Sequence, residues 1–447
     1  MATTMTKRLH SFWVARTPLG SEPDFSESRR LPGSTGGIAP SWLTPSIWCA
    51  VIVLVIYKVF FVAFNGALTD DFTTVYSAIS RAIDGQPVYN QSYHHVDPLY
   101  LYNPGATLLL FPLGFVDNFM LARQLFILVN AAAIVGALAL LICLMGVRLR
   151  SPILPVGVGL AFTTESVTNT LVFSNINGVL FAALVLFYWL FLSGLKSTTL
   201  HSGTLRALVG GIVLGIAITI KPQFAPLLLL PFAQLQWACV VAGAGAPILI
   251  NAVAWSLIPG ASDYLTKLGP YLAVPRDYAN SSLPGWREYF DLPPAFYSPI
   301  WFLTACAVAL TVIILLRWRN TDPTLWALST GSVLLVGVFS LSSLGQQYYS
   351  MWLFPLLFTC LLRRSIMHTW PAWLATTFFL IDASWHSDLW PVAGRWIATF
   401  LPTVGWVLLI FIAAATTLGW WHFERTQPHP TKQTSDHAYT VLHEQRR

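Results

Sequence analysis

Two adjacent carboxylates, Asp70 and Asp71, are the side chains of this sequence best placed to act as an acid or a base. They belong to the segment TDDFTTVY, residues 69–76, which follows the first long apolar block of the chain. A carboxylate held at the edge of an apolar region can accept the proton of a hydroxyl group as a general base. Asp70 could instead cap a helix that begins near Phe72, because Asp is a favoured N-cap residue. We expect the base to lie in this pair, and we favour Asp71.

Three cations are candidates for binding a phosphate group: Lys221, Arg276 and Lys58. Lys221 precedes Pro222 at a predicted helix break, where an ammonium beside free backbone amides suits an anion. Arg276 is the second candidate, and the alternative for it is a salt bridge to Asp277 or to another acidic residue of its loop. Lys58 lies inside the first apolar block, where ionisable groups are costly and usually functional or paired, but its long side chain could also reach the membrane surface.

Hydroxyl, amide and carboxylate side chains that could bind sugar hydroxyls cluster near the predicted ends of membrane spans. Tyrosines are common at membrane interfaces, and amides can join neighbouring helices, so each type also has a purely structural explanation. His94 and His95 are adjacent and point apart in any regular structure, so we do not expect both to bind one metal ion without other ligands. We predict no metal site and no cofactor. The candidate sugar-binding residues are Asp97, Tyr100, Tyr102, Asn175, Asn177, Asn280, Gln346, Gln347 and Tyr348.

The composition predicts a membrane protein built from helices. Of 447 residues, 55% are hydrophobic and only 10% are charged, and a core of this size could not absorb so much apolar surface without lipid. The basic pI of about 9.1 reflects Lys and Arg in short loops and gives no support to nucleic-acid binding. The five cysteines lie in apolar stretches and predict no disulfide framework.

The distribution of Lys and Arg predicts the orientation in a plasma membrane. Basic residues follow alternate apolar blocks, which places both termini in the cytoplasm and loops 67–103 and 259–298 outside. We expect a flexible cytoplasmic tail over 1–43, a membrane domain over 44–420 and a second cytoplasmic tail over 421–447. Residues 206–233 are read as two short legs that meet near Lys221, and segment 105–118 is read as a short interfacial or re-entrant piece. This gives about ten to twelve spans.

Several of these motifs together resemble glycosyltransferase family 87, whose members belong to the GT-C superfamily and use polyprenyl-phosphate sugars. Within the family the match is closest to the decaprenyl-phosphoarabinose-dependent α-(1→3)-arabinofuranosyltransferases. The resemblance covers roughly residues 50–420. The motifs that carry it are TDDFTTVY (69–76), VDPLYLYNPG (96–105), TESVTNTLVFSNING (164–178), KP (221–222), RDYANSS (276–282) and LGQQYYSMWLFP (344–355).

The resemblance implies a GT-C fold with an outward-facing site, an acidic catalytic base in the Asp70–Asp71 pair, and inverting transfer. It implies that arabinofuranose moves from polyprenyl-phosphoarabinose to the arabinan of arabinogalactan or lipoarabinomannan, where it forms α-(1→3) branches. Two other functions remain open at this point. One is a polyprenyl-phosphomannose-dependent mannosyltransferase. The other is a lipid-linked sugar flippase or transporter that would use Glu165 and Lys58 inside the membrane.

Overall fold

The computed structural model describes residues 42–67, 71–93, 99–197, 199–383 and 388–426, and this part of the chain is helical without strands. Eight of its helices are long and apolar enough to cross a membrane. The prediction of an all-α, multi-pass membrane protein is therefore confirmed. These eight segments are α2 continued by η1 (Leu43–Ile56 and Tyr57–Ala63), α5 (Phe119–Leu144), α8 (Asn177–Leu195), α9 (Leu200–Ile220), α11 (Trp237–Leu257), α14 continued by η5 (Pro294–Leu315 and Leu316–Trp318), α15 (Pro323–Leu341) and α18 (Pro391–Thr426).

The other segments for which the sequence predicts spans are short or broken. Proline and polar residues interrupt them, because proline cannot continue a helical hydrogen-bond ladder. The expected total of ten to twelve spans remains a prediction. These shorter pieces are α6 (Ile153–Phe162), α7 (Glu165–Val172), η3 (Pro222–Leu228), α10 (Leu229–Ala233), η6 (Gln347–Leu353), α16 (Phe354–Phe358), η7 (Thr359–Leu361), η8 (Ile366–His368) and α17 (Trp370–Leu380).

The chain changes direction at Lys221, as the sequence predicts, but only the second of the two legs is short, because α9 is long enough to span the membrane. Helix α9 ends there, and η3 and α10 then lead back along the bundle. The amide of Gln234 donates to the backbone oxygen of Arg319, and that of Gln236 donates to the oxygen of Phe191, so the returning segment reaches the far ends of α8 and α14. The helix break therefore leaves Lys221 at a turn rather than in the middle of a span.

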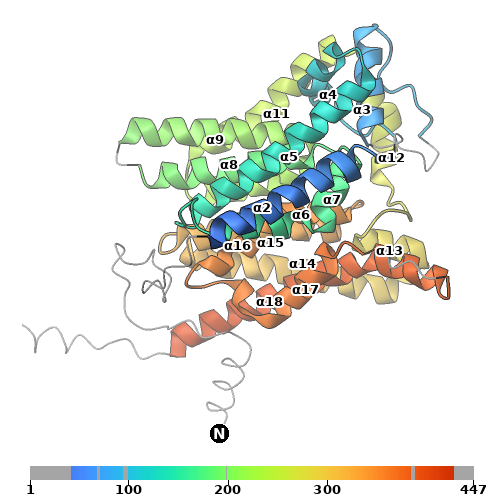
Figure 1. Ribbon diagram of the computed structural model, residues 1–447. Coiled ribbons are helices and arrows are strands. Elements are labelled where there is room, and N and C mark those ends of the chain that lie inside the picture. The colour runs from blue at the N-terminus through green and yellow to red at the C-terminus, as the bar shows by residue number, and fades with distance from the viewer. Residues whose placement is uncertain (1–41, 68–70, 94–98, 198, 384–387, 427–447) are drawn as a thin grey trace, which may run out of the picture.

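Short helices gather at one end of the bundle, which we call the α3 end (Figure 1). Helix α5 begins there, where Phe119 packs against Phe72 of α3 with ring centroids 5.8 Å apart. The two loops that the sequence predicts outside the membrane are joined at this end, because the backbone N–H of Val88 donates to the oxygen of Pro259 over 3.1 Å. The short helices are α3 (Asp71–Ile83), α4 (Pro104–Leu110), η2 (Phe111–Phe115), η4 (Tyr264–Leu268), α12 (Gly269–Ala273) and α13 (Leu283–Phe290).

Glycines bring α9 close to α11. A Cβ atom added to Gly211 would lie 2.4 Å from the backbone oxygen of Cys239, and one added to Gly215 would lie 2.7 Å from the Cβ atom of Ala246. Small residues allow membrane helices to approach closely and gain van der Waals contact where the hydrophobic effect offers little. This packing holds α9, and therefore the turn at Lys221, in a fixed place.

Candidate functional site

Asp71 is the first residue of α3 and the centre of a polar cluster. The amide nitrogen of Asn175 donates to Oδ2 of Asp71 over 2.5 Å, and the phenol of Tyr348 donates to the same oxygen over 3.2 Å. The N-terminal end of a helix is a favourable place for a carboxylate, because free N–H groups and the helix dipole point toward it. Asp71 is half-buried, so substrate can still reach it.

Lys221 lies on the inner side of this cluster and is 7% exposed. Its ammonium donates to Oδ1 of Asn177 over 2.9 Å and lies 4.5 Å from the ring centroid of Tyr349 and 5.3 Å from that of Trp352. Within the described residues no carboxylate forms an ion pair with it, although it interacts electrostatically with Asp71. The bundle therefore holds a buried positive charge beside aromatic rings and close to the candidate base.

The connection between α7 and α8 joins Asp71 to Lys221. Asn175, which contacts Asp71, accepts the backbone N–H of Asn177 over 3.2 Å, and Asn177 in turn contacts Lys221. Ser174 has a φ of 49°, a left-handed conformation that turns the chain between the helices. Trp352 donates from its indole to the backbone oxygen of Asn177 over 3.3 Å and ties this connection to η6.

Two further predicted residues lie at the same site. Gln346 accepts a short hydrogen bond from the phenol of Tyr348. Tyr102 lies within electrostatic range of Asp71 and Tyr349, and burial together with the charge of Asp71 raises the pKa of its phenol well above its ordinary value. Tyr102 thus remains a neutral hydrogen-bond donor beside the carboxylate.

Arg276 lies at the edge of this cluster, in the wall of a cavity. Its guanidinium packs 4.8 Å from the ring centroid of Tyr278, and it interacts electrostatically with Tyr349. Among the described residues it forms no ion pair, so the alternative of a salt bridge to Asp277 does not occur. Its Nε atom is buried without a hydrogen-bond partner.

Three residues predicted to bind sugar form hydrogen bonds within the protein. Asn280 is 1% exposed, and its side chain bonds to backbone groups: its amide nitrogen donates to the oxygens of Arg276 and Ser343, and its amide oxygen accepts the N–H groups of Ser282 and Gly345. Because every hydrogen-bonding position of this side chain is used, it acts as a bracket between two loops.

Tyr100 and Gln347 are likewise occupied. Tyr100 is fully buried, and its phenol pairs with the hydroxyl of Thr107 over 2.6 Å. The amide of Gln347 donates to the backbone oxygen of Phe379 over 3.3 Å. The sequence could not separate these residues from Tyr102 and Gln346, because both groups combine the same side-chain types with the same apolar surroundings.

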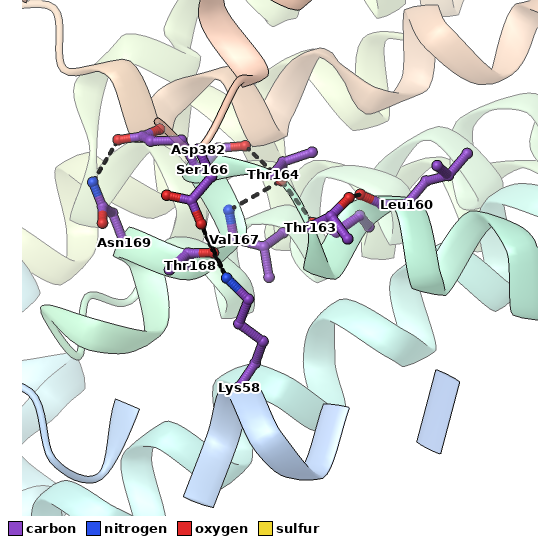
Figure 2. Close-up of polar contacts among 11 residues, drawn as sticks. Lys58, Leu160, Thr163, Thr164, Ser166, Val167, Thr168, Asn169 and Asp382 are labelled. Carbon is purple, nitrogen blue, oxygen red and sulfur yellow. Dashed lines mark hydrogen bonds and ion pairs between the residues drawn. The ribbon is translucent and has the colours of Figure 1, made fainter. Parts of the chain in front are cut away.

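Lys58 belongs to a second polar cluster, shown in Figure 2. Its ammonium donates to the hydroxyl of Thr168 over 2.9 Å and forms a 3.0 Å ion pair with Asp382, while Thr168 donates to the same carboxylate over 2.9 Å. Nearby, Asn169 donates to Glu165 over 2.6 Å. Lys58 therefore neither reaches alone toward the membrane surface nor shares contacts with Lys221.

The predicted candidates Asp70 and Asp97, together with His94 and His95, lie outside the described residues. The expected choice between Asp70 and Asp71 therefore rests on the contacts of Asp71.

Arg123 and Asp382 are absent from the sequence-based predictions, whereas Tyr349 and Trp352 appear there only within the motif LGQQYYSMWLFP and without a role. The fully buried Arg123 donates from Nη2 to the oxygen of Val172 over 3.0 Å and to that of Ala63 over 3.3 Å, so it joins the ends of α7 and η1. A charged residue inside the apolar α5 was the available signal. Aromatic residues gave no such signal, because they are common throughout membrane helices.

The cluster brings together what a group transfer from an activated sugar requires. A half-buried carboxylate can take a proton, a nearby ammonium can offset negative charge on a leaving group, and amide and phenol groups can orient hydroxyls. The cluster therefore favours transfer to a hydroxyl acceptor with an anionic leaving group.

Comparison with known proteins agrees with this chemistry. The model of glycosyltransferase family 87 matches residues 100–344. An α-(1→3)-arabinofuranosyltransferase of Corynebacterium glutamicum is 50% identical over 83% of this chain and 87% of its own length, and one of Mycolicibacterium smegmatis is 38% identical over 82% and 83%. A polyprenol-phosphate-mannose-dependent α-(1-2)-phosphatidylinositol pentamannoside mannosyltransferase of M. smegmatis is 25% identical over 81% and 87%. No solved structure gives a significant match.

Proposed function

The chain belongs to glycosyltransferase family 87, and on this premise we propose that it moves arabinofuranose from polyprenyl-phosphoarabinose onto arabinan. It is a membrane-embedded glycosyltransferase that acts on a sugar donor and a sugar acceptor and forms α-(1→3) linkages. The acceptor is the arabinan of arabinogalactan or lipoarabinomannan. The observation that carries the proposed mechanism is the position of Asp71, hydrogen-bonded by Asn175 and Tyr348 and within electrostatic range of Lys221.

A polyprenyl phosphate fits a helical membrane protein as the donor carrier. Its tail can lie against apolar helix faces, while its phosphate is the leaving group and the sugar carbon attached to it is already activated. The ammonium of Lys221 would offset the negative charge that develops on the leaving oxygen, with Arg276 as the second candidate for this role. The sugar identity follows the relatives with the higher identity, since the mannosyltransferase is a distant match.

The transfer is a single displacement that inverts the anomeric carbon. The carboxylate of Asp71 takes the proton of the acceptor hydroxyl, and the hydroxyl oxygen forms a bond to the anomeric carbon of arabinose. The bond between that carbon and the phosphate oxygen breaks, and polyprenyl phosphate leaves on the opposite face. Asn175 and Tyr348 hold the carboxylate in place, and orientation of both substrates can supply several kcal/mol of the barrier reduction.

We place the reaction on the outer side of the plasma membrane, with both termini in the cytoplasm. The support is the charge distribution. Helices α5 and α8 start at the α3 end and lead to Arg148, Arg150 and Lys196 at the opposite end, and Lys and Arg mark cytoplasmic loops.

The test is the Asp71→Asn variant, assayed as purified protein with synthetic polyprenyl-phosphoarabinose and an arabinan oligosaccharide. We expect turnover to fall by about 10²–10⁴-fold, as is usual when a general base is removed, while donor binding persists. Asp84→Asn is the matched control, because Asp84 follows the same helix and is exposed. Near-normal turnover in Asp71→Asn would reject Asp71 as the base.

A parallel assay with a polyprenyl-phosphomannose donor, followed by linkage analysis of the product, tests the sugar. We expect an α-(1→3)-linked arabinofuranose product. If the protein transferred only mannose, the proposed arabinose donor would be wrong and the mannose donor would take its place in the proposed function.

A further inference from the structure

A cavity of about 710 Å³ opens at the α3 end beside the Asp71 cluster. Its walls come from three loops: residues 91–93 of the first, 266–276 of the second and 343–344 of the third. The volume lies in the range of about 300–1,000 Å³ that is typical of sites for small molecules. The proposed chemistry at Asp71 does not by itself account for this space.

The lining offers hydrogen-bond donors and aromatic rings. The amide oxygen of Gln91 accepts the backbone N–H of Tyr100, and its amide nitrogen is left without a partner among the described residues. Arg276 contributes the buried Nε that lacks a partner. The rings of Tyr93 and Tyr271 lie side by side with centroids 5.7 Å apart. Rings of this kind pack against the C–H faces of sugars, while amide and guanidinium groups bind their hydroxyls.

The lining carries two cations and no carboxylate, and Arg276, the one without an ion pair among the described residues, can donate hydrogen bonds to the hydroxyls of a neutral glycan. Lys267 is paired with Asp263 over 2.8 Å, so its charge is already offset. None of the lining residues, all of which lie in the described part of the chain, carries a carboxylate. Leu101, Pro270, Leu272, Val274, Pro275 and Leu344 make much of the remaining wall apolar.

Two segments of the chain connect the cavity walls to the residues around Asp71. Leu101 of its wall precedes Tyr102, which lies within electrostatic range of Asp71. Leu344 of the opposite wall leads through Gly345 to Gln346, which contacts Tyr348. Both walls therefore continue along the chain into residues that lie close to the candidate base.

We propose that this cavity binds the arabinofuranose residues of the acceptor chain that neighbour the hydroxyl receiving the new sugar, an inference that rests on the proposed function. A short neutral oligofuranoside fits the hydrogen-bond donors of the lining, the paired tyrosine rings and the volume of the cavity. The donor fits less well, because its lipid tail belongs between the apolar helices whereas loops at the α3 end form these walls. The cavity thus selects the place on the arabinan at which the branch is added.

Filling the cavity with a large side chain tests this proposal. Thr266 lines the cavity from η4, is exposed and makes no hydrogen bond among the described residues, so Thr266→Trp adds bulk without removing a contact. We expect the KM for a synthetic arabinofuranose oligosaccharide to rise at least about tenfold, the equivalent of one good contact. The KM for polyprenyl-phosphoarabinose and its slow hydrolysis without acceptor should stay within about twofold of wild type.

The matched control is Leu265→Trp, because Leu265 is the neighbouring residue of η4, is 63% exposed and lies outside the lining. It should leave the acceptor KM unchanged. Ser92→Trp fills the cavity from the opposite wall and serves as a second blocking variant should Thr266→Trp fail to fold, as judged by size-exclusion chromatography. If a folded blocking variant keeps the wild-type acceptor KM, or raises only the donor KM, the proposal is wrong.

A direct titration separates this proposal from the proposed function. Binding of the fluorescent arabinofuranose oligosaccharide is measured without donor, in wild type and in Thr266→Trp. Suppose that the wild-type protein transfers no arabinose but binds the oligosaccharide, and that Thr266→Trp weakens this binding. The proposed function would then be wrong, while the assignment of the cavity would stand. A wild type that transfers arabinose with no effect of Thr266→Trp or Ser92→Trp would overturn the cavity assignment alone.

Discussion

At the scale of single residues, two asparagines connect the candidate base to a buried cation. Asn175 contacts Asp71, Asn177 contacts Lys221, and the backbone N–H of Asn177 donates to the side-chain oxygen of Asn175. The side-chain amide nitrogen of Asn177 is buried without a partner, which leaves a donor available beside the ammonium. A phosphate that approaches Lys221 would therefore meet a second hydrogen-bond donor as well as a positive charge.

Lys221→Met tests this role of Lys221. The substitution keeps an unbranched side chain against Tyr349 and Trp352 but removes the charge, so we expect donor affinity to fall by about tenfold or more while acceptor affinity changes little. Titration of both substrates with the purified protein measures this difference. Lys196→Met, at the opposite end of α8, is the control. Equal losses for the two substrates would indicate misfolding instead of a lost phosphate contact.

The residue types of the site could be predicted from the sequence, but which of them face the site and which bind the backbone of the protein could not. The sequence marks Asp71, Asn175, Gln346 and Tyr348 as polar residues near span ends, and the structure brings the four side chains together, while their roles remain predictions. Asn280 has the same character, yet it is used entirely by backbone groups. Whether an amide faces a substrate or a loop depends on contacts between segments far apart in sequence.

At the scale of elements, α7 is the piece that positions the base. Its N-terminal half contacts Lys58 and Asp382 through Thr168, while its last carbonyl accepts Arg123. The segment that follows it delivers Asn175 to Asp71. This network holds η1 and the end of α17 to α7. Removal of the Lys58–Asp382 ion pair should therefore displace the polar cluster around Asp71, which α7 supports.

A double-mutant cycle on Lys58 and Asp382 measures this connection. Each single change, Lys58→Met and Asp382→Asn, should lower stability by about 1–2 kcal/mol, the scale of interhelical polar contacts in membranes. The double variant should lose no more than the worse single one, because the pair acts together. Thermal unfolding in detergent provides the measurement, and additive losses would show that the two residues are not coupled.

The elements also show where sequence reasoning ends. Hydropathy and the Lys221–Pro222 dipeptide correctly predict the long helices and the reversal at Lys221. The pairing of Lys58 with Asp382 joins positions 324 residues apart, and no periodic pattern reports such a contact. Arg123 was missed for a related reason, because its partners are backbone carbonyls, which every residue provides.

At the scale of the whole molecule, the two ends of the bundle differ in character. The α3 end carries the short helices, the cavity and Asp71, whereas the opposite end carries basic turns. If the donor is lipid-linked as proposed, this polarity would confine its use to one membrane surface.

Labelling with a membrane-impermeant maleimide tests the orientation. In a variant without the five native cysteines, we expect Asp84→Cys to react in intact cells and Arg150→Cys to react only after the membrane is permeabilised, since Asp84 and Arg150 are exposed at opposite ends. The reverse pattern would place Asp71 on the cytoplasmic side and overturn the proposed orientation. Substitutions at both positions should leave folding intact because neither side chain is buried.

The bracket formed by Asn280 has a consequence for how acceptor preference can vary. Because this one side chain fastens both Arg276 and the Ser343–Gly345 stretch, the two loops must shift together or remain still. A preference for a different glycan would then arise from exchanged side chains in the cavity lining, while the backbones of the two loops keep their positions.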